Sequence, residues 1–293
     1  MATIDIFAPA KINLFLHVTG RQNDGYHLLD SLVVFADIGD DIVITEATDY
    51  SLSIQGLFRK ALDLTHQNSI TDAVHLAAKA AHREPHLNIK LTKNLPVASG
   101  IGGGSSDAAA TLLACQRLWK TSHLPTTAEI VSTLGADVPV CLHRRPTRVG
   151  GIGDVLNDVG PIPACDLVLV NPGFELPTAA VFKSFNQPFS TPVRAIPTAG
   201  WRDVDDLAHF IDTTRNDLEQ PATTIVPAIG EVLRGLSSQA GCRAARMSGS
   251  GATCFGLFAT PADAQMATIN ILRLNAGWWV KAGRLLPSGP PLT

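Results

Sequence analysis

The stretch PVASGIGGGSSDAAATLL, residues 96–113, says most about the fold of this chain. Its first eleven residues contain four glycines and three serines, and an alanine-rich run follows directly. Glycine has no Cβ, so the backbone N–H groups of such a loop can converge on one ligand. The helix predicted next would add unpaired N–H groups and the positive end of its dipole. The stretch therefore fits an anion cradle, but it also fits a flexible turn before a capped helix, and spacing alone does not decide.

Two common phosphate-binding motifs are absent from this loop. A Walker loop needs a lysine directly after the glycines, and none is present. Counted from Gly100, the third glycine position of a dinucleotide fingerprint is Ser105, and no acidic residue follows at the required distance. Ser105, Ser106 or Asp107 is expected to cap the helix, and a carboxylate at Asp107 would compete with phosphate unless it points aside.

Composition places the chain among globular proteins and excludes several function classes. Its 293 residues suffice for two domains, and 45% apolar against 17% charged residues allow a sizeable core. A net charge of −3 gives no electrostatic footprint for nucleic acid or anionic lipid. The sequence shows no secretory signal, no membrane-spanning run and no zinc-type spacing among its five cysteines. We expect a cytoplasmic protein with reduced thiols and without a nucleic-acid or membrane partner.

Periodicity predicts strands and helices that alternate along the chain. Residues 4–18 are expected to form a strand broken by Pro9, with Ile12, Leu14, Leu16 and Val18 on one face and Lys11, Asn13, Phe15 and His17 on the other. Further strands are expected at 32–36, 41–45, 87–93, 166–171 and 278–282, and residues 184–203 are expected to form a loop. Helices are expected from Asn68, from the glycine loop to Trp119, at 126–134 and from Pro261. This mixture predicts an α+β protein with two domains, residues 1–155 and 156–293.

Five motifs in a fixed order resemble those of the GHMP small-molecule kinases. They span residues 8–256 and read APAKINLFLHVTGRQNDGYHLLDSL, PVASGIGGGSSDAAA, LGADVPVCL, RNDLE and MSGSGATCFG. APAKINLFL and DGYH are most similar to the branch of this family that acts on a cytidyl diphosphate sugar alcohol. The resemblance implies a two-domain GHMP kinase fold with the active site in the cleft between the domains. It also implies ATP, Mg²⁺ and γ-phosphoryl transfer to the 2-hydroxyl of a methylerythritol moiety, in non-mevalonate isoprenoid biosynthesis.

The resemblance assigns catalytic roles to Asp137 and Lys11. A tertiary alcohol is a poor nucleophile, and a carboxylate at Asp137 could accept its proton during phosphoryl transfer. A cation at Lys11 would keep that carboxylate ionised. Without the motif, Asp137 would be read as the cap of a turn before Pro139, and Lys11 as a solvated lysine on an edge strand.

The resemblance also implies that the glycine loop wraps the phosphates of ATP. This assignment covers Pro96, Val97, Ala98, Ser99, Gly100, Ile101, Gly102, Gly103, Gly104, Ser105 and Ser106. Asn68 would contact adenine, although a plain N-cap explains this residue nearly as well. No glutamate has a position that marks it as a magnesium ligand, and Mg²⁺ binds largely through phosphates and water, so no metal ligand is predicted.

Residues from three motifs are the candidates for binding the acceptor substrate. Tyr26 and His27 would recognise cytidine by ring stacking and by hydrogen bonding to its polar edge. Phe182 would stack on the opposite face, although a core phenylalanine on a helix is a serious rival. Asn13, on the strand face of Lys11, and the second glycine turn at Gly249 and Ser250 would face the same cleft, although that turn could simply lead into a strand. Asn216 and Asp217 are expected to support the site rather than touch ligand.

Three other functions compete with this assignment. Another GHMP kinase, acting on homoserine or mevalonate, would not need DGYH. A nucleotide-binding sensor would not need Lys11 or Asp137, and a dinucleotide-binding module would need the missing glycine fingerprint. The sequence leaves the oligomeric state open, and we expect a monomer or a weak dimer.

Overall fold

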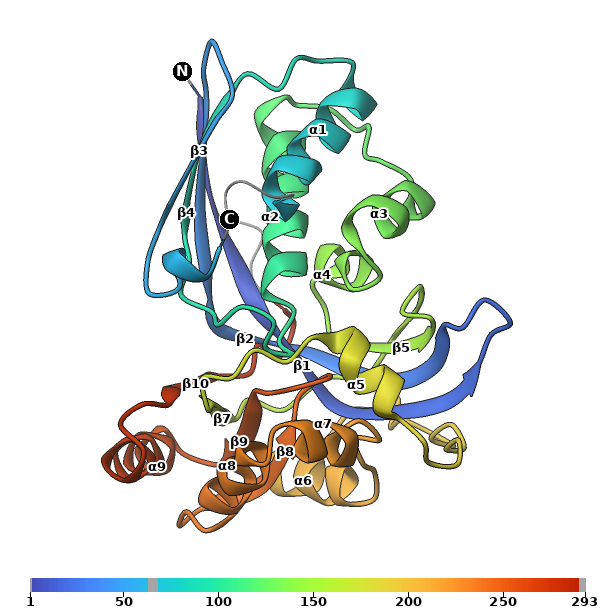
Figure 1. The fold of residues 1–293 in the computed structure, drawn as a ribbon, viewed down its shortest axis with the longest axis vertical. Helices are drawn as coiled ribbons and strands as arrows, with labels where there is room; N and C mark the ends of the chain where they lie inside the picture. The colour runs from blue at the N-terminus through green and yellow to red at the C-terminus, as the bar shows by residue number, and fades with distance from the viewer. Residues whose placement is uncertain (1, 63–67, 290–293) are drawn as a thin grey trace.

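The computed structural model describes residues 2–62 and 68–289. Its strands form two sheets, one of six strands and one of four. In Figure 1 the six-stranded sheet and helices α1–α4 occupy the upper part of the molecule, and the four-stranded sheet with α6–α9 the lower part. This arrangement confirms the α+β class, whereas the division at residue 155 stays a prediction.

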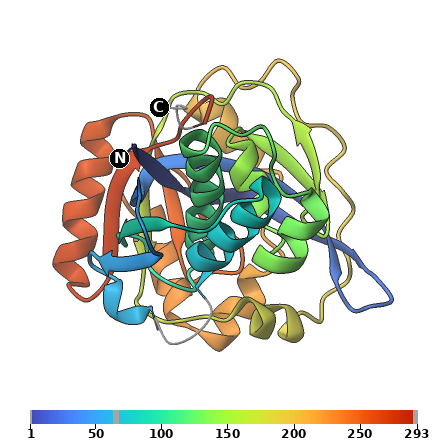
Figure 2. The same ribbon diagram turned by 90° about the horizontal axis from the view of Figure 1, so that it is seen from above.

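The first sheet is built around two long strands, β1 (Thr3–Arg21) and β2 (His27–Glu46). They pair with each other along nearly their whole length. The sheet continues with β3 (Ser51–Gln55), β4 (Leu87–Thr92), β5 (Thr147–Gly151) and β6 (Val155–Asp158) in the order β3-β4-β2-β5-β6. One half of β2 pairs with β4 and the other half with β5. The β1–β2 hairpin projects from one flank of the molecule, as Figure 2 shows.

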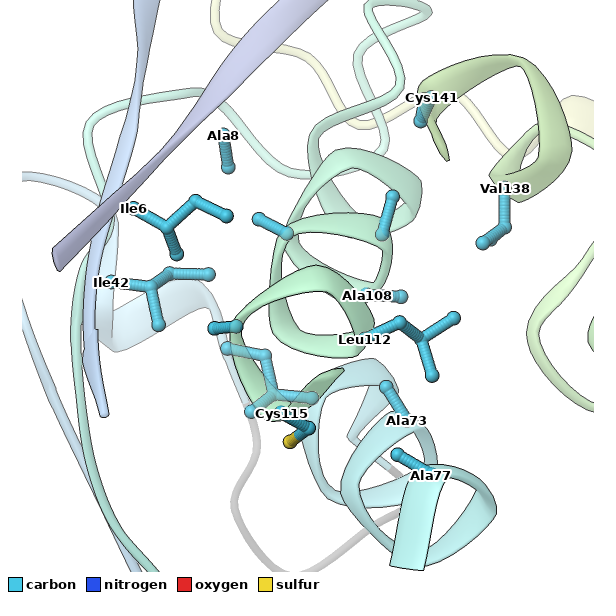
Figure 3. Packing of buried hydrophobic residues seen from close by; sticks show 14 of the residues in the cluster. Ile6, Ala8, Ile42, Ala73, Ala77, Ala108, Leu112, Cys115, Val138 and Cys141 are labelled. Carbon is cyan, nitrogen blue, oxygen red and sulfur yellow. The ribbon is translucent and has the colours of Figure 1, made fainter. Parts of the chain in front are cut away.

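Helix α2 (Gly103–Leu118) is the centre of the first core. Figure 3 shows it between Ile6, Ala8 and Ile42 of the sheet and Ala73 and Ala77 of α1 (Ser69–Ala81). The alanines after the glycine loop, Ala108, Ala109 and Ala110, are buried in this core. Their small side chains allow close helix packing. The other elements of this half are the 3₁₀ turn η1 (Arg59–Ala61), α3 (Thr127–Leu134) and α4 (Val138–His143).

The second sheet is antiparallel, in the order β10-β7-β9-β8. Its strands are β7 (Asp166–Asn171), β8 (Cys242–Met247), β9 (Cys254–Phe258) and β10 (Trp279–Arg284). The helices of this half are α5 (Thr178–Ser184), α6 (Val204–Asp212), α7 (Glu219–Ile225), α8 (Ala228–Ser237) and α9 (Pro261–Leu274). Residues 185–203 form neither helix nor strand, as expected.

One expectation about the long strands was wrong and another was partly right. Residues 37–40, expected to join two separate strands, are part of the continuous strand β2. Strand β1 is continuous at Pro9, which lies opposite Gly39, but its pairing with β2 shifts register between Pro9 and Lys11. In the described part of the sheet, β1 pairs only with β2, so it is an edge strand that tolerates a residue without an N–H.

The alternation predicted for β1 holds only as far as Asn13. A register shift between Asn13 and Phe15 places the Phe15 side chain in the core beside Ile12 and Leu14. A β-bulge of this kind inserts one residue and re-aims the side chains that follow it. Sequence periodicity alone could not predict the bulge.

Two further features bear on the expectations from composition. No helix in the described ranges is long and apolar enough to cross a membrane. All five cysteines are free thiols; four are buried and Cys242 is partly exposed.

Candidate active site

A cleft of about 930 Å³ lies where the two halves of the molecule meet. It is lined by the β1–β2 strands and hairpin, the glycine loop, the start of α4, α5 and the second glycine turn. The predicted site residues that line it are Lys11, Asn13, Tyr26, His27, Asn68, Pro96, Val97, Ala98, Ser99, Gly100, Gly102, Gly103, Gly104, Ser105, Asp137, Phe182, Gly249 and Ser250. The side chains of Ile101 and Ser106 are buried behind the loop and do not line the cleft.

The glycine loop leads into α2 without a side-chain cap. The N-cap residue is Gly102, with φ of 62°, and within the described part of the chain no side-chain capping bond is made to the first turn. The expectation that Ser105, Ser106 or Asp107 caps this helix was therefore wrong, because all three already lie inside it. An uncapped N-terminus that opens into a cleft is well suited to bind an anion.

The loop is held by backbone contacts that only glycine permits. At Gly100, where φ is +76°, a Cβ atom would lie 2.4 Å from the carbonyl oxygen of Ser248 and 2.6 Å from the nitrogen of Gly251. The loop also bonds to the first strand, since the Lys11 N–H donates to the carbonyl of Ile101 at 2.9 Å. Both halves of the molecule therefore fix the loop in one conformation.

Asp107 belongs to a buried ion cluster at the wall of the cleft. Its Oδ2 lies 2.6 Å from Nζ of Lys93, which also contacts Oδ2 of Asp40 at 2.6 Å. Burial raises the pKa of Asp107 to about 7, although Lys93 opposes this shift. Burial disfavours the charge on Lys93, but Asp107 and Asp40 outweigh it and raise the pKa of the ammonium. Lys93 also lines the cleft and lies beside the loop, because a Cβ on Gly103 would be 3.2 Å from its Nζ.

Lys11 and Asp137 form the ion pair that the motifs implied. Lys11 Nζ lies 2.8 Å from Oδ2 of Asp137; the lysine side chain is buried, whereas the aspartate side chain is 47% exposed. Asp137 is the N-cap of α4, yet its side chain makes no capping bond, so the alternative role as a turn cap was wrong. Lys11 is not a solvated lysine either, because only 4% of it is exposed.

An aromatic group lies at the hairpin end of the cleft. The ring of His27 stacks on Phe182 of α5, with centroids 5.0 Å apart and planes 25° apart. Phe182 packs partly on the core and also lines the cleft. Its position is therefore compatible both with a core phenylalanine and with a residue that faces a ligand. Tyr26 is 62% exposed at the hairpin tip. Burial, and secondarily the charge of Arg21, lower the pKa of His27, which favours the neutral imidazole.

The remaining predicted residues have clear structural partners. Asn68 caps α1, since its Oδ1 accepts a bond of 2.9 Å from the N–H of Ile70, and it also lines the cleft. The side-chain amide of Asn216 donates to the carbonyls of Met247 and Gly249, each at 2.8 Å. Asn216 therefore supports the second glycine turn, as expected.

Sequence reasoning missed three residues that shape the site: Asp40, Lys93 and Thr178. Lys93 ends a predicted strand just before the glycine loop, and this position was the one available signal. Asp40 lies 53 positions away from Lys93, between the strands expected at 32–36 and 41–45. The hydroxyl of Thr178 lies 2.9 Å from that of Ser250 in the second glycine turn.

The carboxylates of the cleft do not form a preformed metal cage. Among residues 2–62 and 68–289, no group of three or more His, Cys, Asp or Glu side chains could hold a metal ion. Mg²⁺ fits such a cleft when nucleotide phosphates supply most of its ligands.

Comparison with known proteins agrees with this geometry. Residues 68–145 match the GHMP kinases N terminal domain, and residues 194–267 match the GHMP kinases C terminal domain. The chain is 50% identical over 288 residues to a protein of Ruegeria pomeroyi named 4-diphosphocytidyl-2-C-methyl-D-erythritol kinase. This alignment covers 97% of the chain and 99% of the relative. The chain is 47% identical over 283 residues to a protein of the same name from Cereibacter sphaeroides, over 96% of this chain and 99% of that one. The chain belongs to the 4-diphosphocytidyl-2-C-methyl-D-erythritol kinase family.

Solved structures support membership of this kinase family and of the wider GHMP fold. A crystal structure titled 4-(cytidine 5'-diphospho)-2C-methyl-D-erythritol kinase aligns with a TM-score of 0.77 and 32% identity, over 98% of this chain and all of the other. A homoserine kinase from Cytophaga hutchinsonii aligns with a TM-score of 0.70 at 15% identity, over 99% and 97% of the two chains, which shows the shared fold alone. The chain is therefore a small-molecule kinase, and GHMP kinases use ATP as phosphate donor, generally with Mg²⁺.

Proposed function

We propose that this kinase transfers the γ-phosphoryl group of ATP to the 2-hydroxyl of 4-diphosphocytidyl-2-C-methyl-D-erythritol. The products are ADP and the 2-phosphate, and the reaction belongs to non-mevalonate isoprenoid biosynthesis. One observation carries the proposal: the Lys11–Asp137 pair lies in the same cleft as the uncapped glycine loop and the Tyr26–His27 hairpin. The identity of the curated relatives, 47% and 50% over nearly the whole chain, supports the choice of substrate.

Asp137 is the proposed general base. Its Oδ2 is bonded to Lys11, and its Oδ1 has no hydrogen-bond partner among the described residues, so Oδ1 can accept the proton of the attacking hydroxyl. Lys11 Nζ, 2.8 Å from Oδ2, holds the carboxylate in place. The alcohol oxygen then forms a bond to the γ-phosphorus as the bond to the β-phosphate oxygen breaks.

The glycine loop and α2 are the proposed site for the ATP phosphates. N–H groups that are fixed in advance stabilise the charge that moves onto the leaving group, and they need no rearrangement during the reaction. Asn68 is the proposed contact for adenine. Mg²⁺, bound with the nucleotide, would neutralise phosphate charge, and the described residues offer no dedicated cage for it.

The acceptor is proposed to lie between the ion pair and the hairpin. Tyr26, His27 and Phe182 would hold the cytidine, while Asn13, Gly249 and Ser250 lie nearer the reacting hydroxyl. A neutral His27 can both donate and accept hydrogen bonds, which suits a base with polar atoms of both kinds. We further propose two domains, residues 1–155 and 156–293, in a cytoplasmic monomer or weak dimer with no nucleic-acid or membrane partner.

The proposal is tested by ADP release with Mg²⁺ and ATP. The cytidyl substrate is compared with homoserine, mevalonate and galactose at equal concentrations. Turnover of the cytidyl compound alone supports the proposal. Turnover of another alcohol would support a kinase activity but contradict the proposed substrate. Binding of ATP without any turnover would favour a nucleotide sensor.

A further inference from the structure

Ser31 is a buried residue of β2 that lies beside the predicted substrate residue Asn13. Only 1% of Ser31 is exposed. Its hydroxyl donates to the carbonyl of Phe15 at 2.5 Å, and the side-chain amide of Asn13 lies 2.8 Å from the same hydroxyl oxygen. The bulge between Asn13 and Phe15 brings both groups to this one side chain.

The single hydrogen of this hydroxyl decides how the amide of Asn13 is oriented. A carbonyl can only accept, so the Ser31 hydrogen is committed to Phe15. The hydroxyl oxygen must therefore accept from Asn13, and only the Nδ2 end of the amide can donate. If the amide were reversed, Ser31 would face two acceptors with one hydrogen. The network thus fixes Nδ2 towards Ser31 and Oδ1 on the opposite side.

The Oδ1 atom of Asn13 is left as an unused acceptor at the cleft. It is buried and has no hydrogen-bond partner within the described part of the chain. Asn13 is 4% exposed and lines the cleft, two residues from Lys11. A Cβ on Gly249 would lie 3.3 Å from this oxygen, so the glycine leaves the space beside it open. A buried acceptor without a donor is costly, and a ligand that supplies the donor removes this cost.

We propose that Ser31 is a positioning residue that fixes the Asn13 amide so that Oδ1 accepts a hydrogen bond from a hydroxyl of the acceptor substrate. The inference rests on the proposed function, because it assigns this contact to the polyol part of that substrate. Its neighbouring hydroxyls, on C1 and C3, are the donors that could reach a group so close to Lys11. The site would thus read the hydroxyl pattern around the attacked carbon, in addition to the cytidine.

The test is a double-mutant cycle with Ser31→Ala, Asn13→Ala and the double variant, measured as kcat/KM for the cytidyl substrate. Ser31→Ala frees the amide, and we expect a loss of about tenfold, with the KM for ATP unchanged. The double variant should be no worse than Asn13→Ala alone. A further loss in the double variant would show that Ser31 acts independently and would overturn the inference.

Two controls separate positioning from simple destabilisation. Ser31→Thr keeps the hydroxyl and should restore most of the activity. Ser53→Ala removes a strand hydroxyl that also bonds to a backbone carbonyl, that of Ile89. This variant should leave kcat/KM for the cytidyl substrate unchanged. If Ser31→Thr is as poor as Ser31→Ala, the hydroxyl is not the cause.

A measurement on the unaltered enzyme keeps the inference testable if a variant fails to fold. The wild type is assayed with two substrate analogues, one lacking the 1-hydroxyl and one lacking the 3-hydroxyl. One of them should lose about tenfold or more in kcat/KM, because Oδ1 then stays unpaired. Full activity with both analogues would overturn the inference, whereas inactivity with the complete substrate would instead reject the proposed function.

Discussion

Asp137 is the residue on which the proposed chemistry depends most directly. Asp137→Asn keeps the size of the side chain but removes the basic oxygen, so turnover should fall by about 10²-fold or more. The affinity for ATP should stay nearly unchanged, because the carboxylate is proposed to meet the acceptor hydroxyl and not the nucleotide. Steady-state kinetics and ATP titration measure the two effects.

Asp158 provides a matched control for this substitution. It is another carboxylate with a side-chain partner, His143 Nε2 at 2.6 Å, and its side chain is 65% exposed outside the cleft. Asp158→Asn should leave turnover unchanged. A near-normal rate for Asp137→Asn would remove Asp137 as the base.

Tyr26 is the second residue whose substitution should affect the cytidyl substrate but not ATP. Its exposed ring lies at the hairpin tip, so Tyr26→Ala should raise the KM for the cytidyl substrate several-fold and leave the KM for ATP alone. The other tyrosine of the chain, Tyr50, bonds to Thr71 and lies outside the cleft, so Tyr50→Phe is the control. Equal weakening of both substrates by Tyr26→Ala would place Tyr26 outside the acceptor pocket.

At the scale of elements, the sequence predicted the helices better than the long strands. A helix shows its buried face within a few turns, and α1, α3 and α9 each begin within a residue of the predicted position. The course of β1 and β2 depends on contacts that are far apart in sequence. Gly39, for example, lies between the strands expected at 32–36 and 41–45, but it is part of β2. A Cβ there would lie 2.3 Å from the carbonyl oxygen of Ala8, so the close approach of β1 requires glycine.

The same limit applies to the site. Motifs identified the residues that face the cleft, because each motif is local. They did not identify the groups that hold those residues in place, such as Lys93 beside the loop or Ser31 beside Asn13. These groups act through partners on other strands, and no local pattern reveals such pairs.

The conformation of the glycine loop should depend on the absence of a side chain at Gly100. Gly100→Ala would place a methyl group against backbone atoms of the second glycine turn, at a φ that L-residues rarely adopt. We expect a loss of about 2 kcal/mol or more in the free energy of unfolding, together with weaker ATP binding. Chemical denaturation and nucleotide titration measure these effects.

Gly235 is a matched control, a glycine that alanine should replace without a clash. It lies in α8, and nothing is within 4 Å of a Cβ built there. Gly235→Ala should therefore raise the free energy of unfolding by about 0.5–1 kcal/mol through helix propensity. If both substitutions destabilised equally, the tight packing at Gly100 would not be the reason for its glycine.

At the scale of the whole molecule, the cleft depends on segments that cross between the two halves. The hydroxyl of Ser248, from the second half, donates to the carbonyl of Gly100 in the phosphate loop at 3.0 Å. It also accepts from the backbone N–H of Asn13 at 3.1 Å. Asp30 of β2 accepts two bonds from Arg148 and one from the N–H of Val193. These bonds couple the glycine loop, strands β1 and β2 and the second half into one unit.

The buried cluster of Asp40, Lys93 and Asp107 should make the stability of this unit depend on pH. Burial raises the pKa of Asp107 from 3.8 to about 7, so between these values the folded chain holds a proton that the unfolded chain has lost. Stability therefore falls as pH rises through this window and levels off above about pH 7. The total change from this group is at most about 4 kcal/mol. Denaturant unfolding at pH 5 and pH 8 measures it.

Asp107→Asn tests whether this group is responsible. The amide cannot ionise but can still accept a bond from Lys93, so the variant should lose much less stability between pH 5 and pH 8 than the wild type. Asp49→Asn, at an exposed aspartate that bonds to Thr48 and lies outside the cluster, should follow the wild-type curve. Parallel losses in the wild type and Asp107→Asn would show that the pH dependence comes from other groups. If the free energy of unfolding of Asp107→Asn alone does not change with pH, the buried Asp107 carboxylate lowers the stability of the wild type at neutral pH.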